Sequence, residues 1–154
     1  DSSTTVVQFV RSLSPALSLR IITTAVDVAA AALDHPLAEV IMLGGRLGRL
    51  TRSAIGVGAI DAIRSLRVDY CVLGTCGVDH DLTLRADDFE DAHLKATMIR
   101  AANKTLLLAT ADKLGQAATF EVAPITAVSA LFTSSTDAAI LKSIRETGVD
   151  VETV

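Results

Sequence analysis

Aromatic residues are scarce in this chain of 154 residues: they make up 3% of it, with one Tyr and no Trp. Proteins that hold single-stranded nucleic acid stack its bases on aromatic side chains, so the composition argues against such a platform. Basic residues are not concentrated either, since the net charge is −4 and the densest stretch holds only Arg46, Arg49 and Arg52. Three cations in one glycine-rich loop suit a small ligand but are too few for a DNA duplex. We therefore expect that this chain by itself does not bind DNA.

Long apolar runs, a signal peptide and an initiator Met are also missing. Because the apolar runs are too short to cross a bilayer, we expect a cytoplasmic protein without a membrane partner. The chain starts at Asp1, so we expect it to be part of a longer polypeptide. Cys71 and Cys76 form a lone C-x4-C pair, which is not a zinc pattern, and no other metal-ligand cluster stands out. We expect no metal, no cofactor and two free thiols, with Cys71 buried and Cys76 bordering a pocket.

Apolar residues are abundant, at 50% of the chain, and amphipathic stretches alternate with continuous apolar runs. The runs predict strands at 19–23, 39–43, 68–73, 104–110, 127–133 and 149–152. Helical spacing predicts a first helix that ends at Ser14-Pro15 and further helices at 25–33, 57–66, 87–102 and 137–147. Loops are expected at 44–58 and 74–85, and a short extended piece at 120–123. Together these patterns indicate one α/β domain, residues 1–154, with a mostly parallel sheet and helices on both faces.

Small and polar motifs follow most of these strands or open a helix. In sheets of this kind ligands bind at the carboxyl ends of the strands, so the motifs are expected to share one pocket. They are Asp1 with Ser3, Thr4 and Thr5; Thr23-Thr24; Gly44-Gly45; Gly77 with Asp79; Glu90 with Lys95; and Lys113.

Each motif also has an ordinary structural interpretation. The hydroxyls and free N–H groups before the first helix suit a phosphate, but Ser and Thr are also common N-caps. Gly44-Gly45 suits either the close approach of a ligand or a tight turn. Asp79 suits a sugar hydroxyl or a solvated loop, and Lys95 and Lys113 are each either ligand-binding or surface lysines.

The order of the motifs resembles the C-terminal sensor domain of DeoR-family transcriptional regulators over essentially the whole chain. Its Asp-x-Gly-Thr-Thr motif stands here as Asp1–Thr5, its strand ending in Gly-Gly as residues 40–45, and its Gly-(Ile/Val)-Asp as residues 77–79. Its acidic helix with Glu and Lys matches Glu90 and Lys95, and its Ala-Asp-x-x-Lys-x-Gly turn matches residues 109–115. Ser3, Thr24, Asp81 and Thr110 replace a Gly, an Asn, a Gly and an Asp of the family pattern.

The resemblance implies a fold shared with ribose-5-phosphate isomerase, glucosamine-6-phosphate deaminase and CoA transferases. It also implies a sensor of phosphorylated sugars or related metabolites, which forms a homo-oligomer and binds DNA only through an N-terminal winged helix-turn-helix that is absent from this chain. The first strand of the sheet is then incomplete, since the motif that ends it begins at residue 1.

The resemblance also gives the site residues their expected roles. Ser3, Thr4 and Thr5 would hold the phosphate beside Asp1, backed by Lys113. The floor would be Thr23, Gly44 and Gly45, and the hydroxyl end would meet Gly77, Asp79, Glu90 and Lys95.

Two alternatives stay open. An isomerase or deaminase of the same fold would need a general base, for which Asp79, Glu90 and Asp112 are candidates. An oligomerisation module that has lost its ligand would explain the four replacements.

Overall fold

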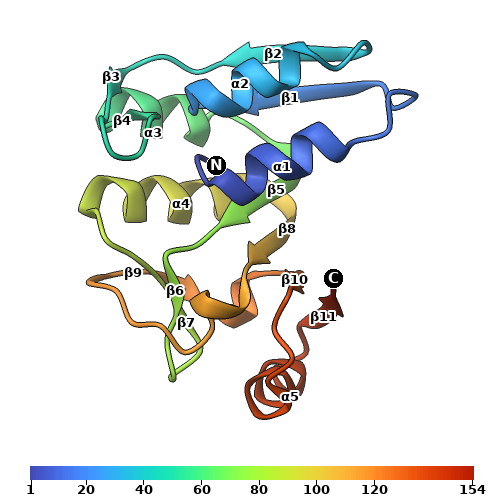
Figure 1. Cartoon of the computed structure of the whole chain (residues 1–154). Coiled ribbons are helices and arrows are strands. Elements are labelled where there is room, and N and C mark those ends of the chain that lie inside the picture. The colour runs from blue at the N-terminus through green and yellow to red at the C-terminus, as the bar shows by residue number, and fades with distance from the viewer.

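Two groups of parallel strands form the main sheets of the protein, in a computed structural model that describes all 154 residues (Figure 1). Four strands hydrogen-bond in the order β11-β10-β8-β5, and β1 pairs with β2 in a separate two-stranded sheet. The bounds are β1 Leu19–Thr23, β2 Ala38–Met42, β5 Val68–Gly74, β8 Ala102–Ala109, β10 Ala130–Thr133 and β11 Asp150–Thr153. The predicted α/β fold with a mostly parallel sheet is confirmed.

Five α-helices connect these strands, each close to its predicted place: α1 Thr4–Ser12, α2 Val26–Leu33, α3 Val57–Arg64, α4 Phe89–Ala101 and α5 Ala138–Glu146. Three of them begin at a residue whose side chain accepts a hydrogen bond from the first turn: Ser3 for α1, Asp88 for α4 and Asp137 for α5. Such caps satisfy N–H groups that the helix leaves unpaired, which fixes where each helix begins. None of the helices is long and apolar enough to span a membrane.

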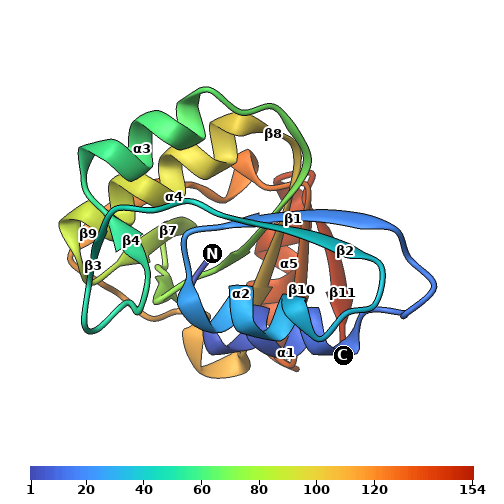
Figure 2. The same ribbon diagram turned by 90° about the horizontal axis from the view of Figure 1, so that it is seen from above.

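Neighbouring residues of the strands alternate between two apolar clusters, one on each face of the sheet. Val72, Leu108 and Phe132 pack with α1 and α2, whereas Leu73, Leu107 and Leu131 join the larger cluster on the other face. Seen from above, α1 and α2 lie on one side of the strands, and α3 and α4 lie on the other (Figure 2). This alternation is the expected result of the two-residue period of a strand.

The two predicted loops are partly wrong, because each contains a small hairpin. Within 74–85 the chain forms β6 Gly77–Val78 and β7 Thr83–Ala86, and β7 also pairs antiparallel with β9 Phe120–Pro124. Within 44–58 it forms β3 Arg46–Leu47 and β4 Ala54–Ile55. Val78 and Leu84 are fully buried and anchor the first hairpin, so its apolar residues belong to the core.

The strand predicted at 127–133 is also shorter than expected. It begins at Ala130, because the chain after Pro124 first makes the 3-10 turn η2, Ile125–Ala127. A second such turn, η1 Ala111–Lys113, follows β8.

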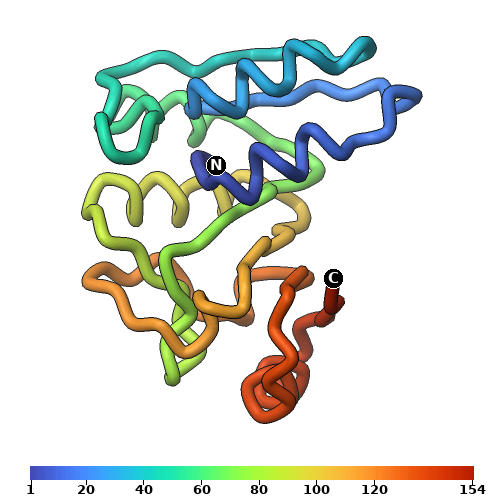
Figure 3. The backbone as a smooth tube through the Cα atoms, viewed as in Figure 1, coloured from blue at the N-terminus to red at the C-terminus, as the bar shows by residue number.

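Backbone hydrogen bonds divide the chain at α3. Those of residues 1–55 stay within that segment, those of residues 56–66 stay within α3 and its two ends, and those of residues 67–154 stay within theirs. In Figure 3 most of the blue and cyan segment lies above the yellow and red one. We call residues 1–55 the N-terminal segment and residues 67–154 the C-terminal segment.

Candidate functional site

The carboxylate of Asp1 lies buried where α1 meets the end of β5. Its Oδ2 accepts a hydrogen bond of 2.7 Å from the backbone N–H of Gly74, and its Oδ1 lies 2.5 Å from Lys95 Nζ. The side chain of Asp1 is 2% exposed and that of Lys95 is 5% exposed. The ion pair therefore joins the N-terminal and C-terminal segments in a place that is largely shielded from water.

A second carboxylate, that of Asp91, completes this cluster. Asp91 Oδ2 lies 3.6 Å from Lys95 Nζ, one helical turn away on α4, and Lys95 also donates to the carbonyl oxygen of Gly74 at 3.3 Å. Asp91 Oδ1 is buried and has no hydrogen-bond partner. Two carboxylates against one ammonium leave the cluster with a net negative charge and one acceptor without a donor.

Asp91 is a site residue that sequence reasoning missed, although its spacing from Lys95 is a signal for it. Asp91 and Lys95 are four residues apart, the spacing at which helical side chains meet, whereas Glu90 and Lys95 are five apart. The surface interpretation of Lys95 is wrong, because the residue is 4% exposed.

Beside this cluster lies the N-terminal end of α1. Ser3 Oγ accepts from the N–H of Val6 at 3.1 Å, which leaves the N–H groups of Thr4 and Thr5 without an acceptor. These two groups lie at the positive end of the helix dipole, which favours an anion. Ser3 thus serves as the N-cap, and the vacant donors belong to the two residues after it.

The predicted floor of the pocket lies between β1 and the hairpin β3–β4. Thr23 Oγ1 accepts from the N–H of Ala25 at 3.0 Å, so its hydroxyl oxygen is already used in a turn. The neighbouring hydroxyl of Thr24 is buried without a partner, as is that of Ser53. Buried hydroxyls without partners are uncommon, and sequence reasoning had singled out only the first of these three residues as a ligand contact.

Gly44 and Gly45 differ in what surrounds them. Gly45 has φ +152°, and a β-carbon there would lie 3.3 Å from the Cβ of Ala54, so the hairpin packs directly on it. No atom lies within 4 Å of the place where a β-carbon on Gly44 would stand. The open side of this motif is therefore at Gly44.

Two ion pairs hold the glycine-rich loop in place. Arg46 pairs with Glu90 at the first turn of α4, and Arg52 pairs with Asp27 on α2 through bonds of 2.5 and 2.7 Å. The bonds from Arg52 lower the pKa of the Asp27 carboxyl. Of the three loop arginines, two are thus occupied by carboxylates of this chain.

The remaining predicted site residues, Gly77, Asp79 and Lys113, form a separate group around the hairpin β6–β7. A β-carbon on Gly77 would lie 2.1 Å from the carbonyl oxygen of Gln116, so this glycine permits close packing. Asp79 Oδ2 lies 3.5 Å from Arg85 Nε, and Lys113 Nζ lies 3.3 Å from Asp112 Oδ2. None of these three residues hydrogen-bonds or pairs with Asp1 or Lys95.

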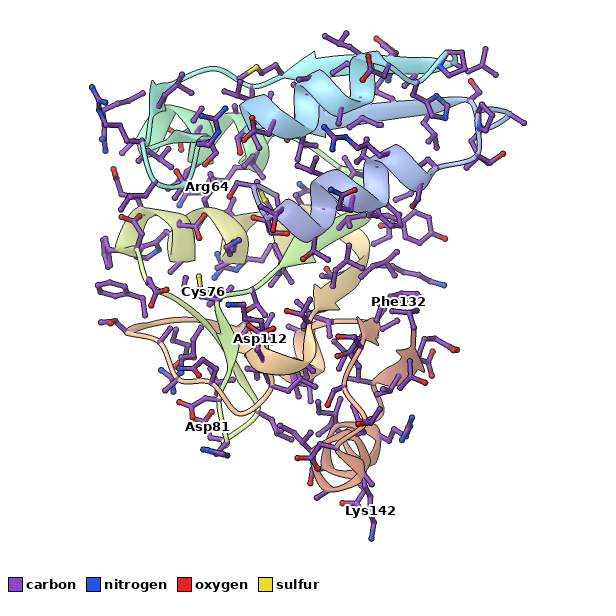
Figure 4. All side chains as sticks on the ribbon, viewed as in Figure 1. Arg64, Cys76, Asp81, Asp112, Phe132 and Lys142 are labelled. Atoms are coloured by element: carbon purple, nitrogen blue, oxygen red, sulfur yellow. The ribbon has the colours of Figure 1, made fainter.

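The carboxylates of Asp112 and Asp81, which lie near this second group, already have partners within the chain. The Thr110 hydroxyl and then Lys113 lower the pKa of Asp112, and the Thr83 side chain lowers that of Asp81. In Figure 4, Asp112 lies near the middle of the molecule and Asp81 lies toward the tip of the hairpin. Because Gly74 is in register with Leu108, η1 follows β8 at the same end of the sheet as the Asp1 cluster.

Both cysteines are free thiols, as predicted. Cys71 is buried, and the burial raises its pKa above the ordinary value. Cys76 is partly exposed at the end of β5.

Comparison with known proteins places these features in a family. A family model described as the DeoR C-terminal sensor domain matches residues 1–135. The transcriptional repressor CsqR of Escherichia coli K12 is 34% identical over 140 residues, which are 91% of this chain and 54% of that protein. The repressor GlcR of Bacillus subtilis 168 is 30% identical over 134 residues, 86% of this chain and 51% of that protein.

The glycerol-3-phosphate regulon repressor of Escherichia coli K12 is 28% identical over 118 residues, 77% of this chain and 47% of that protein. The chain thus spans about half the length of the curated relatives it matches. With a family model that covers most of its residues, the chain belongs to the family of DeoR C-terminal sensor domains.

Proposed function

We propose that this chain is the effector-sensing domain of a transcriptional repressor, and that its effector is a phosphorylated sugar or polyol. The observation that carries the proposal is the meeting of two kinds of vacant polar group at one end of the sheet. The N–H groups of Thr4 and Thr5 are donors suited to a phosphate, and Asp91 Oδ1 is an acceptor suited to a hydroxyl. A ligand with a phosphate at one end and hydroxyls along its length satisfies both.

The charges of the Asp1 cluster decide which group takes the phosphate. Lys95 already faces Asp1 at 2.5 Å and Asp91 at 3.6 Å, so a phosphate there would meet two carboxylates. The N-terminus of α1 carries no acidic residue in its first turn. We therefore assign the phosphate to Ser3, Thr4 and Thr5, with Lys113 approaching from the end of β8.

We assign the hydroxyl end of the ligand to the acidic side of the site. Asp1, Glu90 and Lys95 lie there together with Asp91, and Thr23, Gly44 and Gly45 form the floor. Gly77 and Asp79 shape the hairpin that borders the far side. In this arrangement the ligand contacts the N-terminal and C-terminal segments at once.

The names of the relatives support a sensor rather than an enzyme, because CsqR, GlcR and the glycerol-3-phosphate regulon repressor are all named as repressors. The surroundings of the residues that could act as the general base of an isomerase also favour a sensor. Asp79, Glu90 and Asp112 each already pair with a cation of this chain. A general base works best with a pKa near the operating pH, and the pKa of Asp112 is lowered instead.

We also propose that the full protein is a homo-oligomer whose subunit arrangement responds to the effector. Large apolar side chains lie exposed around the end of α2 and the start of β2, with Leu33 74% and Leu37 51% exposed. An effector shifts such an assembly only by binding one arrangement better than another. The DNA-binding part lies in the residues of the full protein beyond this chain.

Calorimetry on the full protein tests the ligand class. Glycerol-3-phosphate, glucose-6-phosphate and ribose-5-phosphate are titrated beside glycerol, glucose, ribose and inorganic phosphate. We expect at least one phosphate ester to bind and its dephosphorylated partner to bind at least about a hundredfold more weakly, since charge-assisted bonds to the phosphate are lost. Equal binding of ester and parent compound would contradict the phosphate assignment. Conversion of an ester to product would favour the isomerase or deaminase instead.

Substitutions at the helix end test the position of the phosphate. Thr4→Pro removes one N–H, and proline is well tolerated at the first position of a helix, whereas Thr4→Ala removes only the hydroxyl. We expect Thr4→Pro to weaken ester binding more than Thr4→Ala does. Undiminished binding after Thr4→Ala together with Lys113→Ala, and also after Thr4→Pro, would overturn the site assignment.

A further inference from the structure

The outer edge of β2 is a bare strand edge at the border of the molecule. β2 hydrogen-bonds to β1 on one side only, and it lies along the top of the protein in Figure 1. A bare edge offers unpaired N–H and C=O groups to any other strand, and native proteins protect it with charged side chains, prolines or bulges. β2 contains no Lys, no Pro and no bulge.

The free backbone groups of this edge belong to Val40 and Met42. The C=O of Leu37 and the N–H of Leu43 both bond to β1. Because the backbone groups of successive residues point to opposite sides of a strand, the odd-numbered residues between these two also face β1. Val40 and Met42 therefore direct their N–H and C=O groups outward, away from β1.

The side chains at this edge are apolar, and the edge carries no net charge. Four exposed apolar residues lie in or beside β2: Leu33, Leu37, Ile41 and Met42. The only charged residue of β2, Glu39, pairs with Arg20 of β1 at 2.7 Å. A strand that approached this edge would thus meet apolar side chains and a neutralised carboxylate.

The strand at the opposite border of the protein, β11, is protected in the usual way. It pairs with β10 on one side only, and its residues Asp150 and Glu152 are exposed and take part in no ion pair. Two unpaired carboxylates in four residues repel a strand of the same kind. The chain thus protects one outer edge by charge and leaves the other unprotected.

We propose that β2 pairs antiparallel with β2 of a second copy of this chain, across a twofold axis that passes beside Ile41. The inference rests on the homo-oligomer proposed above and adds the surface and the register by which two copies meet. A twofold interface uses the same surface of both copies, so a strand without net charge is complementary to itself. β11 of a second copy is excluded as the partner, because Asp150 and Glu152 would be brought against apolar side chains.

The free backbone groups favour this register. With Ile41 opposite the same residue of the second copy, Val40 of each copy exchanges two hydrogen bonds with Met42 of the other, and all the outward groups of both residues are used. A register centred on Val40 would instead place Met42 opposite Ala38. The N–H of Ala38 already donates to the carbonyl oxygen of His35 at 3.3 Å, so the C=O of Met42 would be left without a donor.

The charges favour the same register. In the register centred on Ile41, the two Glu39 residues lie about 14 Å apart along the paired strands, from four residues of rise. In the register centred on Val40 they would lie only about 7 Å apart, on the same face of the sheet. The first register therefore keeps the two carboxylates well separated.

The interface strand leads directly into the proposed ligand site. β2 ends at Met42, two residues before Gly44, where the floor of the site is open. A ligand seated at Gly44 therefore fixes the end of the strand that carries the second copy. This placement couples effector binding to the pairing of subunits, and each would change the affinity of the other by the same factor.

Sedimentation of the full protein tests the interface without a ligand, so its result is separate from that of the effector titrations. Met42→Pro removes an N–H that the β1–β2 ladder does not use, which an edge strand tolerates. Thr153→Pro is the matched control on β11, because Asp150 and Val154 bond toward β10 and Thr153 therefore faces outward.

We expect Met42→Pro to weaken an association step by about tenfold or more, since each dimer loses two hydrogen bonds. Thr153→Pro should leave that step unchanged. An association step of unchanged strength in Met42→Pro would contradict the proposal. A full protein that is monomeric at every concentration would leave the edge to a different partner and would also overturn it.

Cysteine crosslinking tests the register without a proline. Ile41→Cys would place two thiols across a pair whose α-carbons lie about 4.5 Å apart, a separation that a disulfide spans. Glu152→Cys is the control, because its side chain is exposed at the protected edge and its backbone faces β10 as that of Ile41 faces β1. Wild type gives the background from the partly exposed Cys76.

With oxidised glutathione, we expect Ile41→Cys to form a covalent dimer far above the wild-type background, and Glu152→Cys to stay at that background. No covalent dimer of Ile41→Cys above wild type would overturn the proposed pairing. An equal yield from Glu152→Cys would show that collisions rather than a fixed interface join the copies, and would overturn it as well.

Discussion

The side chain of Ser3 lies directly against the α-carbon of Gly74: a β-carbon added to Gly74 would stand 2.2 Å from Ser3 Oγ. Only glycine at residue 74 allows α1 to begin this close to β5. The same closeness lets Asp1 accept the N–H of Gly74. Ser3, which replaces a glycine of the family pattern, thus fills the space between the N-terminal end of α1, the proposed phosphate site, and the sheet.

This contact predicts a compensating pair of substitutions. Gly74→Ala should lower the free energy of unfolding by about 1–3 kcal/mol, because an overpacked site must shift its neighbours. In a Ser3→Gly background the cost should shrink, since two of the three close atoms belong to Ser3. Ser3→Gly alone should cost a few tenths of a kcal/mol, because glycine is a fair N-cap. Urea unfolding of the four proteins measures the coupling.

Gly58→Ala is the matched control for this pair. No atom lies within 4 Å of the place where its β-carbon would stand, and Gly58 lies within α3. Alanine there should stabilise the protein by up to about 1 kcal/mol. A Gly74→Ala cost that is unchanged by Ser3→Gly would show that the clash lies elsewhere.

Lys95→Met should be strongly destabilising. It leaves the buried Asp1 carboxylate with one N–H partner and no cation, and breaking a buried pair in this way costs about 3–5 kcal/mol. Lys142→Met is the control, because Lys142 is exposed and lies 3.8 Å from Glu146; its effect should stay within about 0.5 kcal/mol. Chemical denaturation at neutral pH compares the two, and equal effects would contradict the importance of the buried pair.

Arg52 combines a favourable ion pair with an unfavourable backbone conformation. Its φ is +50°, so Arg52→Gly should be more stable than Arg52→Ala by about 1 kcal/mol, although both lose the pair with Asp27. The pKa of Asp27 is lowered in the folded protein, so this pair stabilises the fold above the ordinary carboxyl pKa and is lost as pH falls below it. The stability gap between wild type and Arg52→Gly should therefore narrow below about pH 4. Thermal unfolding across that pH range checks both statements.

The two thiols should differ in reactivity. Burial raises the pKa of Cys71, and the thiolate is the reactive form, so Cys71 should react with iodoacetamide much more slowly than Cys76 at neutral pH. Peptide mass spectrometry after timed alkylation measures both rates in one sample. Urea should make the rates alike, because it removes the burial. Equal rates in the folded protein would contradict the buried position of Cys71.

Sequence patterns predicted the parallel strands and all five helices, because continuous apolar runs mark the strands and apolar residues at helical spacing mark the helices. The hairpin β6–β7 was missed because its strands have two and four residues, too few for a period to show. Its turn also contains Leu82 with φ +60°, a conformation that leucine rarely signals.

The candidate site was only partly predictable for a different reason. The sequence predicted that the site residues lie at the ends of strands, and therefore which of them lie near one another. It did not predict which hydrogen bonds and ion pairs these residues form. Lys95 was assigned to the hydroxyl end of a ligand, yet the nearest partner of its ammonium is Asp1, 94 residues away in the chain. Such a pairing depends on how two segments dock, which no local pattern records.

The divided backbone hydrogen bonding of the fold has a mechanical consequence. The side-chain hydrogen bonds that cross between the N-terminal and C-terminal segments involve only Asp1, with Gly74 and Lys95, and the pair Arg46–Glu90. Both sets of polar contacts lie at the proposed ligand site. The site therefore also supplies the polar contacts between the N-terminal and C-terminal segments, which are otherwise held together by side-chain packing. Strengthening or weakening these contacts would change how rigidly the N-terminal segment is held against the C-terminal segment, without unfolding either segment.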